Sequence, residues 1–446
     1  MNLNLKVMKN SNKSMFFIGV FATLQLGAQT ILTKKEAIKV ALENNYGIKI
    51  AANNVEVAKN NSSIYNTRYL PTVSASTGTN YSNNNQGITR QDGAVTTVNG
   101  AVTKSYNASV NLNYTLFDGL GRKYNYQQLK ETYNLTQLQA RETIENTYLQ
   151  LFTVYFQIAR LSENTKNLEE ALTISKQRLK RAEYQYEYGQ STKIELLNAQ
   201  VDVNNDRIAL MNSKQQYSNS KRSLNIVLGV TKQEDFEVDT TVDFNTLLEF
   251  SKLLEQAKAN NILLQQNKKN IAISEFNIKI SKASFLPKVS LTSSYGWNKS
   301  VNPATSFLAQ SQSTGLNAGL NLSWNIFDGG STKTRIANSK IALETQKISE
   351  QQQQETVANN LKNTWESYQN SLFVLKAQEQ NILTSQNNFD RTKEKHKLGQ
   401  VTSIEFRQAQ INLINTKTAL SNAKFDAKLI ELQLLQLSGQ LINSYI

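Results

Sequence analysis

The sequence has no cysteine, a single histidine, and only 3 prolines and 18 glycines among its 446 residues. Without cysteine there is no disulfide framework, no thiol nucleophile and no thiolate metal ligand. The one histidine, His396, excludes metal sites built on a histidine pair, and we interpret it as a helix-packing residue. The chain also has neither a Gly-x-Ser-x-Gly nucleophile motif nor a Gly-x-x-x-x-Gly-Lys-Ser/Thr phosphate loop. We therefore expect no enzymatic activity, no cofactor and no metal site.

The scarcity of proline and glycine also points to a structure. Proline breaks a helix interior and glycine weakens it, so their low numbers permit long uninterrupted helices. Only 39% of the residues are hydrophobic, which argues against a bundle of membrane-spanning helices. The composition therefore favours long helices, and together with the strand patterns described below it predicts a mainly α-helical protein with a small β part.

The charge is unbalanced, with 49 lysines and arginines against 35 aspartates and glutamates and a net charge of +14. Such an excess is common in proteins that bind nucleic acid. Here, however, charges of both signs alternate along the helical stretches, as they do on solvated faces. A nucleic-acid-binding coiled coil is kept only as an alternative, which cytoplasmic fractionation would favour. We expect no nucleic-acid partner.

Residues 1–28 have the pattern of a secretory signal peptide. Three lysines precede an apolar run at residues 15–26, and Gly27-Ala28 provides small residues before a cleavage site. The run is too short to remain as a transmembrane helix. No later stretch is apolar enough for one, so any membrane-embedded part of this exported protein is expected to consist of strands.

The rest of the chain is an internal duplication. The segment 188–195 (YGQSTKIE) reappears as 398–405 (LGQVTSIE), and the Phe-Asp-Gly at 117–119 reappears at 327–329, both at an offset of 210. The Leu-Pro at 70–71 matches the Leu-Pro at 286–287 at an offset of 216. We assign 29–230 to the first repeat, 246–446 to the second, and 231–245 to an equatorial linker between them.

Each repeat is predicted to contain a helix, a strand hairpin, a long helix, a tip turn and a return helix. The first repeat is divided into a helix at 34–69, strands at about 72–82 and 105–117, a long helix at about 118–188, a tip at 189–192 and a return helix to about 228. The second has strands at about 288–298 and 314–327, a long helix at about 328–398 and a tip at 399–402. Proline ends the first helix, and Asp118 and Asp328 are predicted to cap the long helices. About 70 residues of helix correspond to roughly 105 Å.

A heptad-like stripe runs along both long helices. It is formed by Ile144, Leu151, Ile158, Thr165, Leu172, Leu179 and Tyr186 in the first repeat, and by Leu361, Tyr368, Leu375, Ile382, Phe389 and His396 in the second. The stripe indicates a narrow packing seam on an otherwise wet helix. A plain coiled coil and a solvent-filled helical barrel fit this pattern equally well.

The predicted strands alternate strictly between apolar and polar residues. At 105–117, Tyr106, Val110 and Leu112 alternate with asparagine and serine. Transmembrane barrel strands have this pattern, and so does a half-buried soluble sheet. Two isolated hairpins in an exported helical chain favour the barrel, with 83–104 and 299–313 as polar extracellular loops. Four strands cannot close a barrel, and an open edge in lipid leaves backbone groups unsatisfied, so we expect subunits to share it.

In these features the sequence resembles the TolC-like outer membrane efflux proteins. The resemblance rests on the two-repeat order, the Leu-Pro and Phe-Asp-Gly junctions, and the tip segments at 188–200 and 398–410. It implies a homotrimer with a twelve-stranded barrel in the outer membrane lipid and a twelve-helix barrel that crosses the periplasm of a Gram-negative cell. It also implies a periplasmic adaptor (membrane fusion) protein that docks on the tip and, through it, an inner-membrane pump that supplies the energy.

The resemblance further implies where the tip is constricted and where the adaptor binds. The acidic constriction positions of the family fall on Glu195 and Glu405, and a further one holds Gln408, a departure that weakens a cation-binding ring. The adaptor-binding tip is assigned to Gly189, Gln190, Ser191, Thr192, Leu196, Leu197, Ala199 and Gln200 and to Gly399, Gln400, Val401, Thr402, Phe406, Ala409 and Gln410. Gly189 and Gly399 are interpreted as the pivots of tip opening. For the two glutamates, an ordinary exposed helical position is the alternative interpretation.

A different class of function remains open. An exported structural or adhesive coiled-coil protein of the cell envelope accounts for the signal and the heptads but not for the duplicated hairpins. Failure of the purified protein to form pores would favour it.

Overall fold

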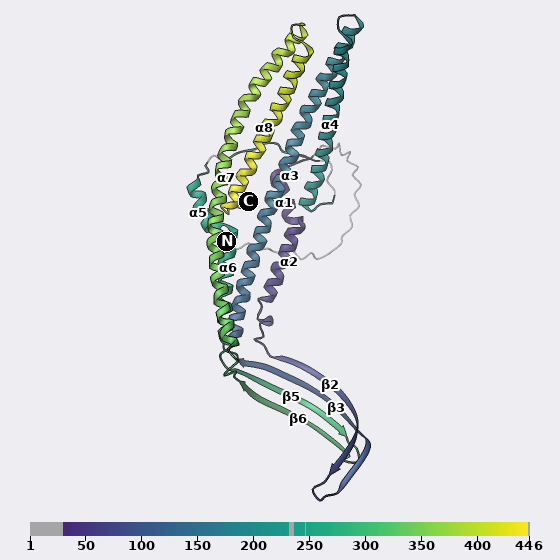
Figure 1. The fold of residues 1–446 in the computed structure, drawn as a ribbon, viewed down its shortest axis with the longest axis vertical. Helices are drawn as coiled ribbons and strands as arrows, with labels where there is room; N and C mark the ends of the chain where they lie inside the picture. The colour runs from purple at the N-terminus through teal and green to yellow at the C-terminus, as the bar shows by residue number, and fades with distance from the viewer. Residues whose placement is uncertain (1–29, 232–235, 246, 445–446) are drawn as a thin grey trace, which may run out of the picture.

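Two helices of 67 residues each, α3 (Gly121–Glu187) and α7 (Ser331–Lys397), run through almost the whole helical part of the molecule. The computed structural model describes residues 30–231, 236–245 and 247–444, so the predicted signal peptide lies outside the described residues. At one end α3 and α7 continue from a sheet, and at the other each turns back as a shorter helix (Figure 1). These return helices are α4 (Lys193–Leu228) and α8 (Ser403–Leu437).

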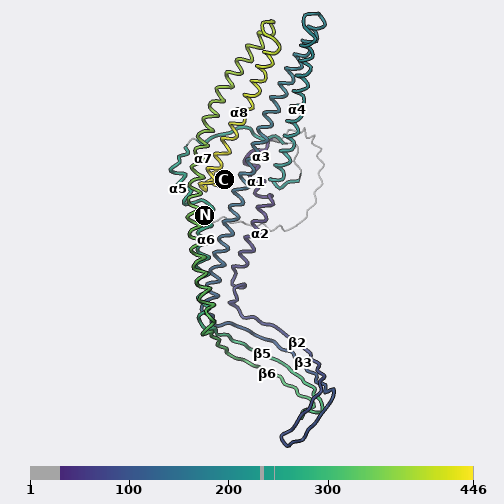
Figure 2. The backbone as a smooth tube through the Cα atoms, in the orientation of Figure 1, coloured from purple at the N-terminus to yellow at the C-terminus, as the bar shows by residue number. Residues whose placement is uncertain are grey.

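The two helical hairpins, α3/α4 and α7/α8, lie next to each other, with α3 against α8 (Figure 2). The predicted heptad stripe is buried between helices over much of its length. Its residues Leu151 and Ile158 in α3, and Leu361 and Phe389 in α7, are all buried. His396 stacks on Phe406 with ring centroids 4.8 Å apart. Its role as a packing residue is thus supported, and burial lowers the pKa of its imidazole.

Four antiparallel strands form one sheet in the order β2-β3-β5-β6. Their bounds are Thr72–Thr89 for β2, Val95–Phe117 for β3, Lys288–Val301 for β5 and Gln310–Ser323 for β6. The predicted loop at 83–104 is wrong, because most of it is strand and only a short turn at 90–94 joins β2 to β3. The loop at 299–313 shrinks to 302–309, and β6 ends before residue 327. Apolar alternation underestimates these strands because backbone pairing continues through stretches without that alternation, such as the asparagine, glutamine and glycine residues at 83–87.

The predicted helix at 34–69 is also wrong, because it is interrupted at Asn45. It divides into α1 (Lys34–Asn44) and α2 (Tyr46–Asn61), and a 3₁₀ turn at Ile64–Asn66 follows. The second repeat divides in the same way, at Asn261, into α5 (Phe250–Asn260) and α6 (Ile262–Ala283).

Each break is made by an asparagine side chain that serves two helices. The Asn45 carboxamide oxygen accepts from Ile48 N at 3.0 Å, and its amide nitrogen donates to Val227 O at 2.7 Å. Asn261 caps α6 in the same way, accepting from Leu263 N at 3.1 Å, and donates to Leu437 O at 2.9 Å. An asparagine that satisfies backbone groups in this way competes with the helix. The breaks therefore place α2 and α6 end to end with α4 and α8.

Each long helix also begins with help from an aspartate that lies two positions before its N-cap residue. The N-cap residues are Leu120 and Gly330, both in the left-handed region. Asp118 accepts from Arg122 N at 3.0 Å, and Asp328 accepts from Thr332 N at 2.8 Å. The two aspartates therefore bond to the first turn of each long helix as predicted, but they are not the N-cap residues themselves.

The core lies at the middle of the molecule, where aromatic residues of α3 pack against α8. Tyr148, Phe152, Tyr155 and Phe156 are at most 2% exposed, and Phe156 stacks on Phe425 of α8 at 5.5 Å. Each such side chain contributes roughly 2–3 kcal/mol by its removal from water.

The linker between the repeats is held against this core. Its strand β4 (Phe236–Val238) pairs in parallel with β1 (Thr30–Leu32). The Tyr155 hydroxyl donates to Leu32 O at 2.6 Å and accepts from Asp239 N at 2.9 Å, so it joins the two strands. Further along, Glu431 accepts from Asn245 N at 3.1 Å. Three-residue strands carry no periodicity, which is why the sequence predicted no structure here.

No helix in the described part of the chain is both long and apolar enough to cross a membrane.

Candidate functional site

One face of the four-stranded sheet is polar and uncharged. The rows of paired residues that begin at Thr72, Ser74, Ser76, Gly78 and Asn80 contain only serine, threonine, asparagine and glycine across all four strands. One such row joins Ser76, Ser109, Gly296 and Gly315. Side chains on this face bond to one another, as Ser76 and Ser109 do at 2.9 Å. This face is suited to contact water without selecting for charge.

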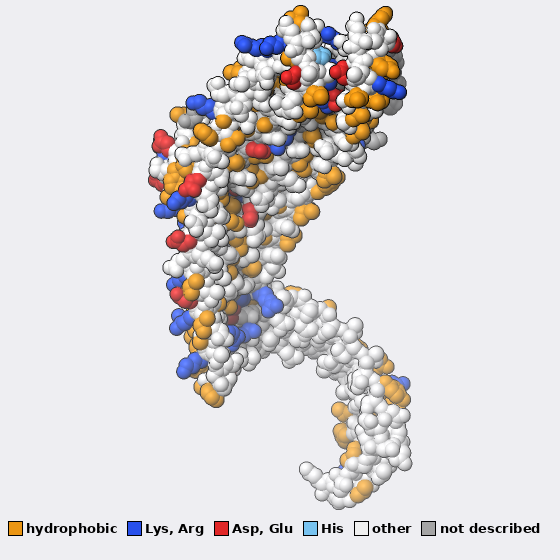
Figure 3. All heavy atoms as spheres, turned by 45° about the horizontal axis from the view of Figure 1, so that its top comes forward, with side chains coloured by type: hydrophobic (Ala, Val, Ile, Leu, Met, Phe, Trp, Pro, Cys, Tyr) orange, Lys and Arg blue, Asp and Glu red, His pale blue; other side chains and the backbone are white. Residues whose placement is uncertain are grey.

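The opposite face of the same strands carries the apolar side chains of the sheet, which are exposed, together with Lys104 and Lys299 in the rows farthest from the helices. A row there joins Ala75, Val110, Tyr295 and Leu316, of which Leu316 is 68% exposed. Figure 3 shows the sheet as mostly neutral, with the charged side chains concentrated on the helices. An apolar outer face and a polar inner face are the arrangement of a barrel wall in lipid.

The sheet is open within this chain. β2 and β6 lie at its two edges and have no further strand partner among the described residues. Exposed edges present unpaired backbone donors and acceptors, and these are costly in lipid. The wall therefore needs strands from other chains to close.

At the other end of the molecule the two tip turns have nearly the same geometry. Gly189 and Gly399 have φ of 69° and 72°, and the following amides donate back to Gln185 O at 2.7 Å and Lys395 O at 2.9 Å. Thr192 and Thr402 are the N-caps of the return helices. These turns are the ends of the predicted tip segments.

The two acidic tip residues have local structural roles as well as exposed carboxylates. Glu405 accepts from Thr402 N at 2.8 Å in a capping box, and this backbone bond, with the threonine hydroxyl, lowers the pKa of its carboxyl. Glu195 accepts from the Ser191 hydroxyl. Gln408 is exposed and donates to Asn412 at 2.8 Å. All three side chains are exposed close to the tip turns.

The structure removes four residues from the predicted adaptor-binding tip. Ala199, Phe406, Ala409 and Gln410 are at most 6% exposed and pack against the chain's own helices. Gln410, for example, donates to Ala171 O of α3 at 3.0 Å. Positions 406, 409 and 410 share one face of α8, and that face is turned inward. The remaining positions of the set are exposed or half-buried: Gly189, Gln190, Ser191, Thr192, Leu196, Leu197, Gln200, Gly399, Gln400, Val401 and Thr402.

Close to the tip, a group of five side chains joins the two hairpins. We call Ser175, Arg178, Asp202, Asp206 and Arg407 the tip network. Arg407 of α8 donates to both carboxylate oxygens of Asp206 in α4, at 2.7 and 2.8 Å. Arg178 of α3 donates to Asp202 at 3.1 Å and to Ser403 O of α8 at 3.2 Å. Bidentate pairs of this kind are among the strongest hydrogen-bonded contacts in proteins.

Sequence reasoning missed the tip network, although the duplication contains a signal for it. At the offset of 210, its four charged positions correspond to neutral residues: Asn388, Asn412, Thr416 and Leu197. The Ser175–Asp206 bond at 2.5 Å corresponds to a neutral Ser385–Thr416 bond at 3.0 Å within the second hairpin. Three of the four charged residues of the tip network therefore belong to the first hairpin, and Arg407 of α8 joins them across the contact between the two repeats.

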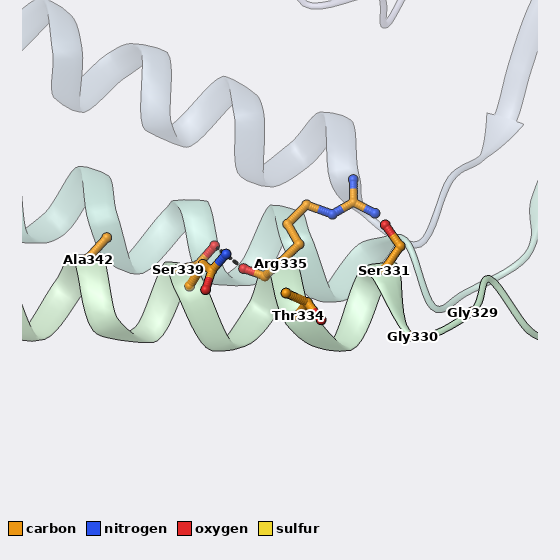
Figure 4. A pocket seen from close by; sticks show the side chains of 8 residues that line it. Gly329, Gly330, Ser331, Thr334, Arg335, Ser339 and Ala342 are labelled. Atoms are coloured by element: carbon orange, nitrogen blue, oxygen red, sulfur yellow. Dashed lines mark hydrogen bonds between the residues drawn. The ribbon is translucent and has the colours of Figure 1, made fainter.

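A shallow open groove lies at the sheet end of α7. It is lined by the first turns of the helix, from Gly329 to Ala342. Figure 4 shows the Arg335 side chain extended across it and the Ser339 hydroxyl bonded to the Arg335 carbonyl. No group of acidic residues or histidine in the described ranges is arranged to hold a metal ion.

Comparisons with known proteins cover both repeats. The family model described as outer membrane efflux protein matches residues 37–230 and 253–440. The chain is 21% identical over 405 residues to outer membrane efflux protein BepC of Brucella suis, covering 91% of this chain and 85% of that one. It is 21% identical over 305 residues to outer membrane protein TolC of Vibrio cholerae, covering 67% and 69%.

Solved structures share the fold at lower sequence identity. The CmeC outer membrane channel of Campylobacter jejuni superposes with a TM-score of 0.77 at 16% identity, covering 97% of this chain and 94% of that one. The structure of CusC gives 0.73 at 18% identity, with 96% and 95% covered.

Proposed function

Since the chain belongs to the outer membrane efflux protein family, we propose that it is the passive exit duct of a tripartite efflux or type I secretion system. The observation that carries this proposal is the sheet with one uncharged polar face and one exposed apolar face, which continues directly into α3 and α7. At 1.5 Å per residue each of these helices is about 100 Å long. A duct built on them reaches from the outer membrane far into the periplasm.

Three copies of the chain close this duct. Each copy supplies four strands, and twelve are enough for a barrel that encloses a water-filled interior. The edges β2 and β6 of neighbouring copies pair, which satisfies the backbone groups left open in one chain. The long and return helices form the wall of the periplasmic part.

The duct opens at its tip when an adaptor protein binds there. Opening requires the hairpins to move relative to one another, and the tip network holds them together. An adaptor changes this equilibrium only if it binds the open arrangement more tightly. Leu197, Gln200 and Gln400 are among the exposed residues available for it. The chain itself supplies no energy, which comes from the pump.

Planar-bilayer conductance of the purified oligomer tests the proposed function. We expect discrete pores, which become larger when the tip is opened by mutation. A well-folded oligomer that forms no pores, even with an opened tip, would contradict the proposal and favour the exported coiled-coil alternative.

The tip carboxylates provide a first prediction. The variant with both Glu195→Gln and Glu405→Gln is expected to lose most of its preference for cations over anions, because the neutral sheet face contributes none. Glutamine is chosen since it retains the capping-box geometry. The measurement is the reversal potential in a salt gradient.

Glu379→Gln is the matched control, because Glu379 is exposed on α7 away from the tip. An unchanged permeability ratio in the double variant would show that the two glutamates do not line the constriction.

The tip turns provide a second prediction. Gly189→Pro and Gly399→Pro together are expected to abolish adaptor-dependent export while the oligomer still inserts into membranes. Proline cannot adopt the positive φ of these positions, and it lacks the N–H that each glycine donates to the preceding turn. Export is measured as loss of cargo from cells.

The control is the pair of alanine variants, since open space surrounds both glycines and only conformational strain is added. Unchanged export in the proline variant would show that the tip is assigned wrongly.

A further inference from the structure

Four lysines occupy repeat-equivalent positions near the sheet. Lys123 and Lys130 lie in the first turns of α3, and Lys333 and Lys340 lie at the same positions of α7, at the offset of 210. We call them the membrane-proximal lysines. All four are exposed, and none has an ion-pair partner within the part of the chain that the structure describes. Further from the sheet, Lys269 of α6 pairs with Glu131 at 2.8 Å, so it is not free to bind an anionic partner.

The four lysines lie on the face of the long helices that the equatorial elements cover further along. Lys130 precedes Tyr155 by 25 residues, and Lys340 precedes Trp365 by 25, which is close to seven turns at 3.6 residues each. Tyr155 bonds to β1 and to the linker, and Trp365 packs against Phe250 of α5. These added elements must lie outside a duct whose interior is open. The lysines therefore also face outward and are exposed, although the Lys130 ammonium lies 4.2 Å from the centre of the Tyr126 ring on the same helix.

Exposed apolar side chains stand directly between these lysines and the sheet. Phe285 and Leu286 are each 50% exposed, Trp324 is 56% exposed and Phe327 is 83% exposed. The Trp324 indole donates to Phe285 O at 3.0 Å, which fixes its ring at this level. Aromatic residues of this kind are enriched where a membrane meets water.

The two aspartates between the sheet and these lysines already have hydrogen-bonding partners within the chain. Asp118 pairs with Arg122 at 3.1 Å, and Asp328 accepts from the first turn of α7. Basic side chains gather beside the sheet on the face shown in Figure 3, and Arg335 adds a further exposed cation there. The level just beyond the apolar residues is therefore strongly positive.

We propose that the membrane-proximal lysines bind the headgroups of anionic phospholipids in the leaflet that faces the periplasm. The inference rests on the proposed function, because it requires the sheet to lie in a membrane. Lys123 and Lys333 lie in the first helical turn, and Lys130 and Lys340 lie about 10 Å further out, within one Debye length. Cations next to an interfacial aromatic layer are attracted to anionic lipid. The membrane-proximal lysines thereby fix the depth of the barrel in the membrane and recruit phosphatidylglycerol-like lipids around it.

Quenching of Trp324 fluorescence by brominated lipid tests this inference. The full oligomer, with Trp297→Phe and Trp365→Phe, is reconstituted with brominated phosphatidylglycerol or brominated phosphatidylcholine in an otherwise identical bilayer. We expect phosphatidylglycerol to be preferred at this site by about five-fold or more. The variant with all four lysines changed to glutamine is expected to show no preference.

The control variant changes four other exposed lysines of the same helices, Lys166, Lys176, Lys362 and Lys376, to glutamine and should keep the preference. Thermal unfolding of both variants checks that the oligomer remains folded. Equal quenching by the two lipids in the parent protein, or a preference that survives loss of the four lysines, overturns the inference. So does a preference lost equally in the control.

Other outcomes identify a different error. If neither lipid quenches Trp324, the sheet is not in the bilayer, and the proposed function fails together with the inference. If quenching occurs without lipid preference while the four lysines retain the protein on isolated peptidoglycan, the anionic partner is that polymer and the lipid assignment is wrong.

Discussion

Replacement of Arg407 by glutamine is expected to open the tip and to raise the open probability of the reconstituted channel by about 100-fold. Arg407 is the residue of α8 that bonds to both oxygens of Asp206 in α4, and its guanidinium nitrogen also lies 3.4 Å from Asp202. It thus joins one hairpin to the other. No other residue of α8 in the described chain makes an ion pair with α4.

The size of the effect follows from burial. The Arg407 and Asp206 side chains are 15% and 9% exposed, so removal of the arginine leaves a carboxylate largely out of water. Breaking such a pair costs about 3 kcal/mol. Because the contact is made only while the hairpins touch, this cost falls on the closed tip, and 3 kcal/mol corresponds to about 100-fold in the closed-to-open ratio.

Single-channel recording measures the result, and two comparisons make it specific. Lys417→Gln removes a more exposed ion pair between the two hairpins, the 3.1 Å pair of Lys417 in α8 with Glu170 in α3, and such pairs are worth about 0–1 kcal/mol. Asp206→Asn should open the tip as Arg407→Gln does, and the double variant should add little, because both act through one contact. Equal open probability for Arg407→Gln, Lys417→Gln and the parent protein would contradict the role of the tip network.

Gly439→Ala is expected to destabilise the protein by about 4 kcal/mol or more and to reduce the yield of assembled oligomer. Gly439 ends α8 with φ of 71°, and a Cβ there would lie 2.5 Å from Asn260 O. Gly229 has the same position in the first repeat, where a Cβ would lie 2.3 Å from Asn44 O. Neither carbonyl can move aside easily, because the next residue, Asn261 or Asn45, is bonded to the end of the facing helix.

Gly189→Ala separates the two causes of this loss of stability, which are the clash of the added Cβ and the strain of a left-handed φ. Gly189 has φ of 69° with nothing within 4 Å of an added Cβ, so it adds only the left-handed strain of about 1–2 kcal/mol. Thermal unfolding followed by circular dichroism, together with the amount of oligomer, compares the variants. If Gly439→Ala and Gly229→Ala unfold at the same temperature as Gly189→Ala, the close approach of the helix ends is not important for stability.

Much of the fold follows from repeated local patterns. The duplication, the heptad stripe and the scarcity of proline predict both long helices, and their observed bounds differ from the predicted ones by a few residues at most. The predicted strand ends too early, at residue 82, because residues 83–87 are asparagine, glutamine and glycine and show no apolar alternation. There the register is set by pairing with β3, which one strand's sequence does not reveal.

The candidate site was predicted only in part. The glycine turns, Glu195 and Glu405 were located by the repeated tip segment, whereas Phe406 and Gln410 were assigned to an exposed surface and are buried. A repeat comparison treats equivalent positions alike, but Gln200 is exposed and Gln410 contacts α3. The difference arises because only α8 lies against the neighbouring hairpin.

The sequence by itself was enough to predict the export signal, the order of the two repeats, the lengths of the long helices and the alternation of the strands. Each of these features depends on residues that are near one another in the chain. The tertiary structure alone decided the helix breaks at Asn45 and Asn261, the β1–β4 pairing that holds the linker, and the tip network. Each of these depends on a side chain that bonds to a partner between 84 and 201 residues away in the sequence. Local periodicity contains no information about such partners, because the packing of the two hairpins brings them together.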